Sequence, residues 1–390
     1  MSHAKGPPPE DLTREKDAQR PQPEGRDITP AVGHRGYPSV WRHAVEDGVV
    51  ALARPNWGDA KWSYLYDKAT RYRAGGEAGT NGTVAEAARA ARGGDEVPVA
   101  VSGPVINAAV WTWEVPLYFW FGGIATGSSF IALACDAAGD HRSARVARMV
   151  ALGAIGPGSP LLVLDLGRPM RFLNMLRIFK PRSPMSMGAW CLSAFSGVMG
   201  SAVLADLLGR EKIARALGAQ GAVLGTYLGS YTGVLLSATA VPVWNRSRTL
   251  LPPIFICTGA ATGAAANRLV LSALGVPAGH PTRRALGAIE TLAMTTELGL
   301  SHLNEKRLGD LGHALEEGRP GKLFRFAKSA VLGGLALRGL GSRLGTAPGH
   351  VSSALFLAAG LAFRFAWVGA GRTSATDHEA VARTARRRRV

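Results

Sequence analysis

Long runs of apolar residues dominate the chain from Trp111 onward, and short polar or Pro-containing segments separate them. Each run is about 20 residues long, the length that an α-helix needs to cross the hydrocarbon core of a bilayer. The pattern therefore predicts an all-α integral membrane protein with about eight transmembrane helices. The expected spans are 113–136, 146–166, 185–208, 216–240, 251–274, 283–303, 326–346 and 349–370.

Two features refine this pattern. Arg338 and Arg343 interrupt the seventh run, so an alternative has seven spans with an interfacial helix in that place. Glycines recur at every fourth residue of the fourth run, which places small residues on one helix face and allows a neighbouring backbone to come close. These positions are Gly221, Gly225, Gly229 and Gly233, and the pairs Gly123/Gly127 and Gly259/Gly263 repeat the spacing.

The first 110 residues have a different composition. Residues 1–36 are rich in Pro and in charges of both signs, which predicts a disordered tail. Residues 37–110 are hydrophilic with interleaved aromatic and basic residues, and we expect a largely irregular arm that orders on a partner. A nucleic-acid patch is the other interpretation of such a mixture, but the arm carries no net charge, so no nucleic-acid partner is expected.

The net charge of +17 arises entirely after residue 110, between the apolar runs. Basic residues in that position are typical of membrane loops. With eight spans both termini lie on one side, and the loops and tail of that side hold 19 Lys and Arg, more than the opposite loops. The positive-inside rule then predicts a multi-pass protein of the plasma (inner) membrane with cytoplasmic N- and C-termini. The N-terminus shows no apolar signal-peptide segment.

Few residues suit a resident redox centre. The three cysteines lie separately inside apolar runs, and of nine histidines only His302 and His350 fall within predicted spans, both near the ends. A cluster or a b-type haem needs several Cys or two buried His. We therefore expect no haem and no metal in this protein.

The most informative segment is Leu164–Trp190, LDLGRPMRFLNMLRIFKPRSPMSMGAW. Apolar and basic residues alternate here with helical spacing, which predicts an amphipathic helix at the membrane surface, ended by Pro181. Asp165 and Arg168 are three residues apart and suit an ion pair. Lipid-phosphate anchoring combined with a helix cap is an alternative explanation of the same residues.

This segment resembles the hallmark string of the NrfD/PsrC family, the membrane subunits of polysulfide-reductase-like and related molybdo-oxidoreductase complexes. The segments WEVPLY with GGIATG and YTGVLLS resemble its first and fourth helices, so the resemblance covers about residues 107–370. Where the first helix of the family offers an Asn and a His to quinone, this protein has Glu114 and Tyr118.

The resemblance implies two four-helix bundles, over 111–240 and 241–371, followed by a basic tail over 372–390. It also implies a quinone pocket in the first bundle, taking menaquinone or ubiquinone. In an up-down bundle the start of span one and the ends of spans two and four share a side. The expected quinone-binding residues on that side are Tyr231, Asp165, Arg168, Glu114 and Tyr118.

The second bundle has its own intramembrane polar residues. Arg268 and Glu290 fall at similar depth in adjacent spans and suit an ion pair, and Glu297 lies seven residues further along the same face. Intramembrane charges are costly and commonly mark function. A proton path is one interpretation and a structural ion pair is the other. The path candidates are Glu290, Glu297, Arg268 and His302.

The function expected from these features is a quinone-reactive membrane anchor without a redox centre of its own. It would pass electrons between a partner's iron–sulfur clusters and the quinone pool. A ferredoxin-like iron–sulfur subunit is expected to dock on the basic segment, and a molybdopterin catalytic subunit completes the complex. The alternatives are a passive anchor and a proton-coupled secondary transporter. The expected docking residues are Arg171, Arg177, Lys180 and Arg182.

Overall fold

A computed structural model describes residues 106, 109, 111–165, 171–344 and 346–377. The predicted tail over 1–36, nearly all of the arm over 37–110, Arg168 and the end of the basic tail lie outside these residues.

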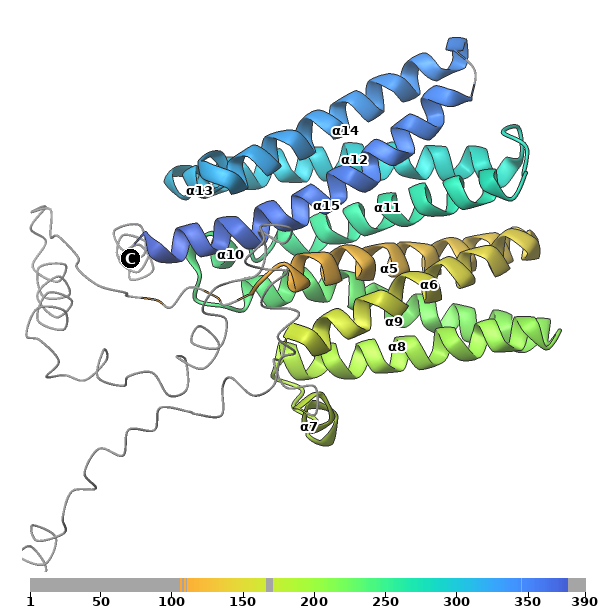
Figure 1. Cartoon of the computed structure of the whole chain (residues 1–390), viewed down its shortest axis with the longest axis horizontal. Helices are drawn as coiled ribbons and strands as arrows, with labels where there is room; N and C mark the ends of the chain where they lie inside the picture. Colours follow the sequence, from red (N-terminus) through yellow and green to blue (C-terminus); the bar gives the residue numbers. More distant parts are fainter. Residues whose placement is uncertain (1–105, 107–108, 110, 166–170, 345, 378–390) are drawn as a thin grey trace, which may run out of the picture. The chain divides into compact units, whose positions relative to one another are not determined.

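Eight long helices match the eight predicted spans in the described part of the chain (Figure 1). They are α5 (Glu114–Ala137), α6 (His141–Asp165), α8 (Pro184–Leu207), α9 (Glu211–Ser237), α11 (Leu251–Ala273), α12 (Pro281–Leu308), α14 (Gly318–Leu344) and α15 (Ala347–Thr376). Short helices fall between them. These are α7 (Arg171–Arg177), α10 (Pro242–Arg246), η2 (Gly309–Gly312) and α13 (His313–Glu316).

Five of the long helices are long and apolar enough to cross a membrane: α5, α6, α8, α11 and α15. Their length and composition confirm the predicted all-α membrane protein. The other three, α9, α12 and α14, have 27, 28 and 27 residues and run alongside the first five. Among the eight long helices, α12 and α14 carry the most charged residues, which lowers their mean hydropathy. The expectation that all eight cross the bilayer stays a prediction.

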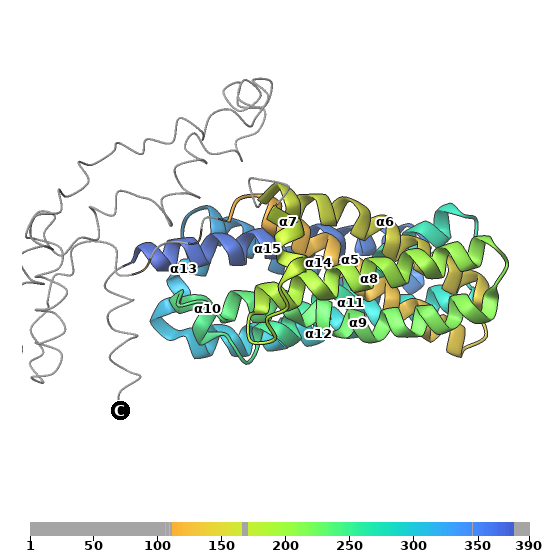
Figure 2. The ribbon, with the colours of Figure 1, turned by 90° about the horizontal axis from the view of Figure 1, so that it is seen from below.

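Consecutive long helices run in opposite directions and pack as neighbours (Figures 1 and 2). One group consists of α5, α6, α8 and α9, and a second of α11, α12, α14 and α15. The inner helices α5 and α11 pack against each other and join the two groups. The short helices α7, α10 and α13 lie toward the end where α15 finishes.

Glycines form the joint between α5 and α11. A Cβ atom added at Gly127 would lie 2.9 Å from the carbonyl carbon of Gly259 and 3.0 Å from the Cα of Gly263. A Cβ at Gly263 would lie 2.6 Å from the Cα of Gly127. Real Cβ atoms do not come this close to another backbone, so the two helices meet only because both faces lack side chains. The predicted packing role of these glycines is confirmed.

The glycine row of α9 lies against three neighbouring helices. A Cβ atom at Gly225 would lie 2.6 Å from Oγ of Ser129 in α5, and one at Gly233 would lie 2.7 Å from Cα of Pro252 in α11. Gly221 faces the side chain of Met199 in α8. This row therefore lets α9 lie close to helices of both groups.

The serine residues before and inside the first turn of α8 fix its start. Ser183 is the N-cap and its Oγ accepts a hydrogen bond from the Ser186 backbone N–H at 3.4 Å. Pro184 occupies the first turn, where its missing N–H costs nothing. The Ser186 Oγ donates to the carbonyl of Ile178 at 3.1 Å and accepts from the Lys180 N–H at 3.1 Å. The SPMS part of the hallmark string thus anchors the segment after α7 to α8.

Candidate functional site

Two buried tyrosines lie inside the first helix group. Tyr118 of α5 and Tyr231 of α9 are each 2 % exposed, and both lie near Cys191 of α8. The Tyr231 ring fills the space beside Gly188 of α8, where a Cβ atom would overlap it. A Cβ at Gly158 of α6 would lie 3.8 Å from the Tyr118 ring. All four helices of the group therefore contribute to this tyrosine cluster.

The hydroxyl of Tyr118 is buried and has no hydrogen-bond partner among the described residues. Leaving a buried hydroxyl unsatisfied costs free energy, commonly about 1–3 kcal/mol. Such a group is ready to donate to a polar atom of a ligand. Tyr227 stacks on Tyr231 with ring centroids 6.1 Å apart and is 37 % exposed, so the two phenols on α9 extend from the protein surface into the cluster.

The predicted acidic residues lie toward the same end of this group. Glu114 is in the first turn of α5, one turn before Tyr118, and is 9 % exposed. Asp165 is the last residue of α6 and is half-buried. Arg168 lies outside the described residues. The structure thus brings Tyr118 and Tyr231 together and places both carboxylates at the end of the group where α5 begins.

Sequence reasoning did not assign the small residues of this cluster a role. Gly188 belongs to the SPMSMGAW string, but its requirement for a missing side chain becomes visible only when Tyr231, 43 residues later, lies against it. At Gly158 a Cβ atom would lie 3.3 Å from Cβ of Phe121, and the Tyr118 ring is only in ordinary contact. A glycine inside an apolar run is a weak signal, because most such glycines serve helix packing alone.

In the second group Glu290 has a different partner from the predicted one. Its carboxylate accepts hydrogen bonds from Arg338 of α14 and, at 2.9 Å, from Ser353 of α15. Arg268 instead donates to the Gly349 carbonyl at 2.5 Å and to Ser353 Oγ at 3.0 Å. The predicted direct Arg268–Glu290 pair is therefore wrong, and Ser353 links the two residues. These contacts are those of a structural ion pair, the alternative that the sequence left open.

The second predicted carboxylate meets an arginine that the sequence analysis did not single out. Glu297 is 4 % exposed and accepts a hydrogen bond from Ser301 Oγ at 2.7 Å. Arg364 of α15 is 2 % exposed and within electrostatic reach of Glu297, and its guanidinium lies 3.6 Å from the Phe255 ring centroid. His302, a candidate for the same path, is exposed on α12 and lies outside this buried set.

A third buried polar set lies at the opposite end of the first group. Arg148 of α6 is 2 % exposed; its Nη1 is 2.6 Å from Asp136 of α5 and its Nε is 2.6 Å from Asp206 of α8. Sequence analysis missed this set, because the three residues lie in separate spans and no spacing rule connects them. Because the arginine is paired with both carboxylates, this set links α5, α6 and α8 by ion pairs.

The predicted docking segment is exposed. Arg177, Lys180 and Arg182 all reach the surface, and the apolar side chains of Leu173 and Phe179 beside them are 52 % and 57 % exposed. Arg171 begins α7, and its side chain is not among those described. A surface that exposes both cations and large apolar groups suits a membrane interface or a protein partner.

The arrangement defines a polytopic α-helical membrane protein with a cluster of buried phenols in its first helix group. Comparison with known families then identifies it: residues 104–302 match the family described as Polysulphide reductase, NrfD. Because this match covers half of the sequence, the protein belongs to the NrfD family, which confirms the resemblance seen in the sequence.

Three relatives are similar to part of this protein. The C subunit of the polysulfide reductase of Wolinella succinogenes is 29% identical over 192 residues, covering 42% of this protein and 59% of the relative. Protein NrfD of Escherichia coli is 28% identical over 195 residues, covering 43% and 61%. A protein NrfD homolog of Haemophilus influenzae is 26% identical over 221 residues, covering 49% and 68%. The protein thus spans about three fifths of the length of the first of these relatives.

Proposed function

We propose that this protein is the quinone-reactive membrane subunit of a multisubunit oxidoreductase. It would pass electrons between a partner iron–sulfur subunit, served by a molybdopterin subunit, and the membrane quinone pool. Family membership supports the class, since the relative in Wolinella succinogenes is named as one part of a polysulfide reductase. The observation that carries the proposal is the buried hydroxyl of Tyr118, which has no partner among the described residues.

The side chains of the tyrosine cluster have the chemistry that a quinone site would need. Its headgroup requires an apolar pocket with a few hydrogen-bond donors for its carbonyl oxygens and a nearby source of protons. Tyr118 and Tyr231 would donate these hydrogen bonds, and Glu114 would hold a proton one turn away. Buried Phe195 and Leu192 line the surrounding core and exclude water. A bound quinone would supply the two-electron chemistry that these side chains lack.

Conservative substitutions test this proposal. We expect Tyr118→Phe and Tyr231→Phe each to lower quinol-linked turnover of the assembled complex at least about tenfold, the effect of about 1.4 kcal/mol of lost transition-state hydrogen bonding. Tyr118→Phe removes only an oxygen that has no partner in the described protein, so stability should be retained. Turnover and binding of a quinone analogue are the two measurements.

Tyr227→Phe is the matched control, because Tyr227 lies one turn from Tyr231 and is 37 % exposed. Its turnover should stay within twofold of wild type. If both inner variants turn over quinol normally, or if the analogue does not bind the wild type, the protein is a passive anchor and the proposal fails.

The proposed orientation places the C-terminal end of α15 and the segment after α7 in the cytoplasm, with the iron–sulfur subunit docked on Arg177, Lys180 and Arg182. Single cysteines at exposed Gly279 and Thr376 test the topology. In spheroplasts a membrane-impermeant thiol reagent should label Gly279→Cys at once and Thr376→Cys only after permeabilisation. Arg177→Cys should behave like Thr376→Cys and lose its labelling when the soluble subunits are present. Labelling of Thr376→Cys in sealed spheroplasts would reverse the orientation.

A further inference from the structure

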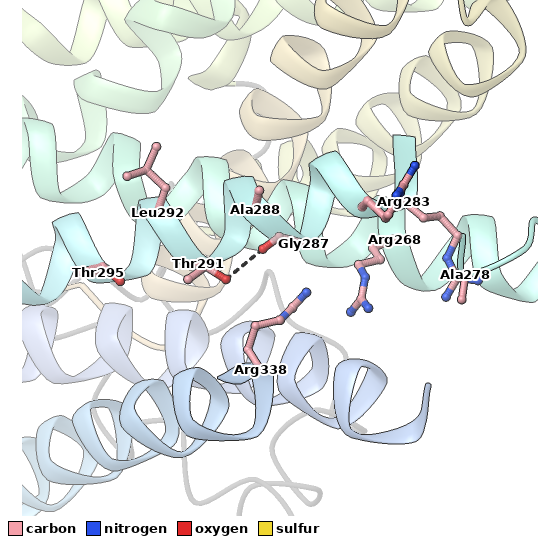
Figure 3. A pocket seen from close by; sticks show the side chains of 10 residues that line it. Arg268, Ala278, Arg283, Gly287, Ala288, Thr291, Leu292, Thr295 and Arg338 are labelled. Carbon is pink, nitrogen blue, oxygen red and sulfur yellow. Dashed lines mark hydrogen bonds between the residues drawn. The ribbon is translucent and has the colours of Figure 1, made fainter. Parts of the chain in front are cut away.

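An open groove of about 560 Å³ lies beside the first turns of α12, outside the tyrosine cluster (Figure 3). Helices α11, α12 and α14 and the loop before α12 form its walls. The ten residues that line it include four arginines and, in the described part of the chain, no carboxylate. The arginines are Arg268, Arg283, Arg284 and Arg338.

Two of these arginines converge on one glycine. A Cβ atom at Gly287 would lie 2.6 Å from Nη1 of Arg338 and 3.9 Å from Nε of Arg268. Figure 3 shows the two side chains reaching into the same space from α14 and α11. The Nε groups of both arginines are buried without a hydrogen-bond partner among the described residues. The groove therefore lies beside guanidinium N–H groups that the described protein leaves unsatisfied.

The charge of the groove is only partly balanced. Glu290 lies behind it and pairs with Arg338, while Arg283 donates to the Val276 carbonyl at 2.7 Å and to Nε2 of His350 at 2.8 Å, which are both uncharged acceptors. Arg284 is exposed at the rim. Among the described residues, only Arg338 of these four arginines forms an ion pair with a carboxylate, and uncompensated charge in a membrane protein is costly. An anion in the groove would balance them.

The groove continues beyond the arginines along the outer face of α12. Its lining passes from Arg284 through Gly287 and Thr291 to Leu292 and Thr295. Eleven residues of helix separate Arg284 from Thr295, or about 17 Å. Leu292 is 71 % exposed and, in a membrane protein, faces lipid. The groove is cationic at the end of the helix and apolar toward its middle, which is the polarity of a phospholipid inserted from the membrane surface.

We propose that this groove binds an anionic phospholipid, with the phosphodiester between Arg268, Arg284 and Arg338 and an acyl tail along Leu292 and Thr295. Arginine forks match phosphate oxygens in pairs, and the missing side chain at Gly287 lets the Arg338 guanidinium lie against α12 at the wall of the groove. Basic pockets between membrane helices are suited to such headgroups. The apolar extension distinguishes this ligand from free inorganic phosphate, which needs the arginine end alone.

Thermal unfolding of the purified full-length protein in a neutral detergent tests the proposal. Adding dioleoyl-phosphatidylglycerol should raise the unfolding temperature, whereas equal amounts of dioleoyl-phosphatidylcholine should raise it by less than a third as much. Ligands that bind only the folded state stabilise it in this way. Arg284→Gln should at least halve the phosphatidylglycerol shift, and Arg268→Gln combined with Arg284→Gln should abolish it.

Arg210→Gln is the matched control, since Arg210 is an exposed arginine that precedes a helix and lies outside the groove. It should retain the full phosphatidylglycerol shift. Two outcomes would overturn the proposal. In the first, inorganic phosphate alone reproduces the shift in unfolding temperature, and the ligand is a free anion. In the second, Arg284→Gln and Arg210→Gln lower the phosphatidylglycerol shift equally. If the double variant does not fold, Arg284→Gln alone decides, because its side chain is exposed.

Discussion

Replacing Arg148 by Met should destabilise the protein by about 3–5 kcal/mol, the cost of breaking a buried ion pair on one side. The reason is geometric: Arg148 is the buried cation that Asp136 and Asp206 share, with contacts of 2.6 Å each, and both carboxylates are under 10 % exposed. Their other basic neighbours, His141 and Arg145, are 39 % and 43 % exposed. Its loss leaves two carboxylates buried close together without their cation. The midpoint of urea unfolding in detergent, followed by circular dichroism, measures the effect.

Arg145→Met is the control for this variant. Arg145 precedes Arg148 by one turn, but its side chain is 43 % exposed and its Nε is 3.8 Å from Asp206. Its replacement should change the unfolding free energy by less than about 0.5 kcal/mol, as is usual for surface positions. Adding Asp136→Asn and Asp206→Asn to Arg148→Met should restore part of the lost stability. Equal effects of Arg148→Met and Arg145→Met would show that the buried set does not hold the helices together.

Gly127→Ala should cost about 1–3 kcal/mol, because the added methyl meets the backbone of α11 and the two helices must separate. Backbone atoms cannot rotate away as a side chain can. Since α5 and α11 join the two helix groups, we expect broader unfolding as well as a lower midpoint. The same urea titration measures both quantities.

Gly122→Ala makes the same chemical change on the same helix. A Cβ atom at Gly122 would have no neighbour within 4 Å. Alanine is the better helix former by up to about 1 kcal/mol, so this variant should be as stable as wild type or more so. If Gly127→Ala is equally well tolerated, the close contact between α5 and α11 does not determine the packing.

The positions of the helices followed closely from the sequence because each long helix contains an apolar run of about 20 residues, bounded by polar or Pro-containing segments. The predicted ends of the helices were less accurate than their positions. The run at 283–303 belongs to a helix that continues to Leu308, and the run at 326–346 to one that starts at Gly318. Helices extend past their apolar runs because backbone hydrogen bonding continues where side chains are polar. Hydropathy detects the membrane segment and not the whole helix.

Residues of the candidate site were predictable where their position within a single helix was enough to single them out. Tyr231 was singled out because its span ends on the side of the expected quinone pocket, and the structure buries it. Ion pairs between side chains of different helices were not predictable in the same way. Glu290 has two arginines at similar depth, Arg268 and Arg338, and only the packing of α14 against α12 and α15 selects Arg338. Arg364 and Arg148 are likewise identified by their neighbours and not by their spacing.

The glycine joint has a consequence for how the protein is made. Gly127 and Gly263 are 136 residues apart, and a ribosome adds about 5–20 residues each second. About 7–27 s therefore pass between the synthesis of Gly127 in α5 and that of Gly263 in α11, the helix that covers the glycine face of α5. During biosynthesis the glycine face of α5 must therefore stay uncovered while the first group of helices is made. The two helix groups can pack together only after α11 has been synthesised.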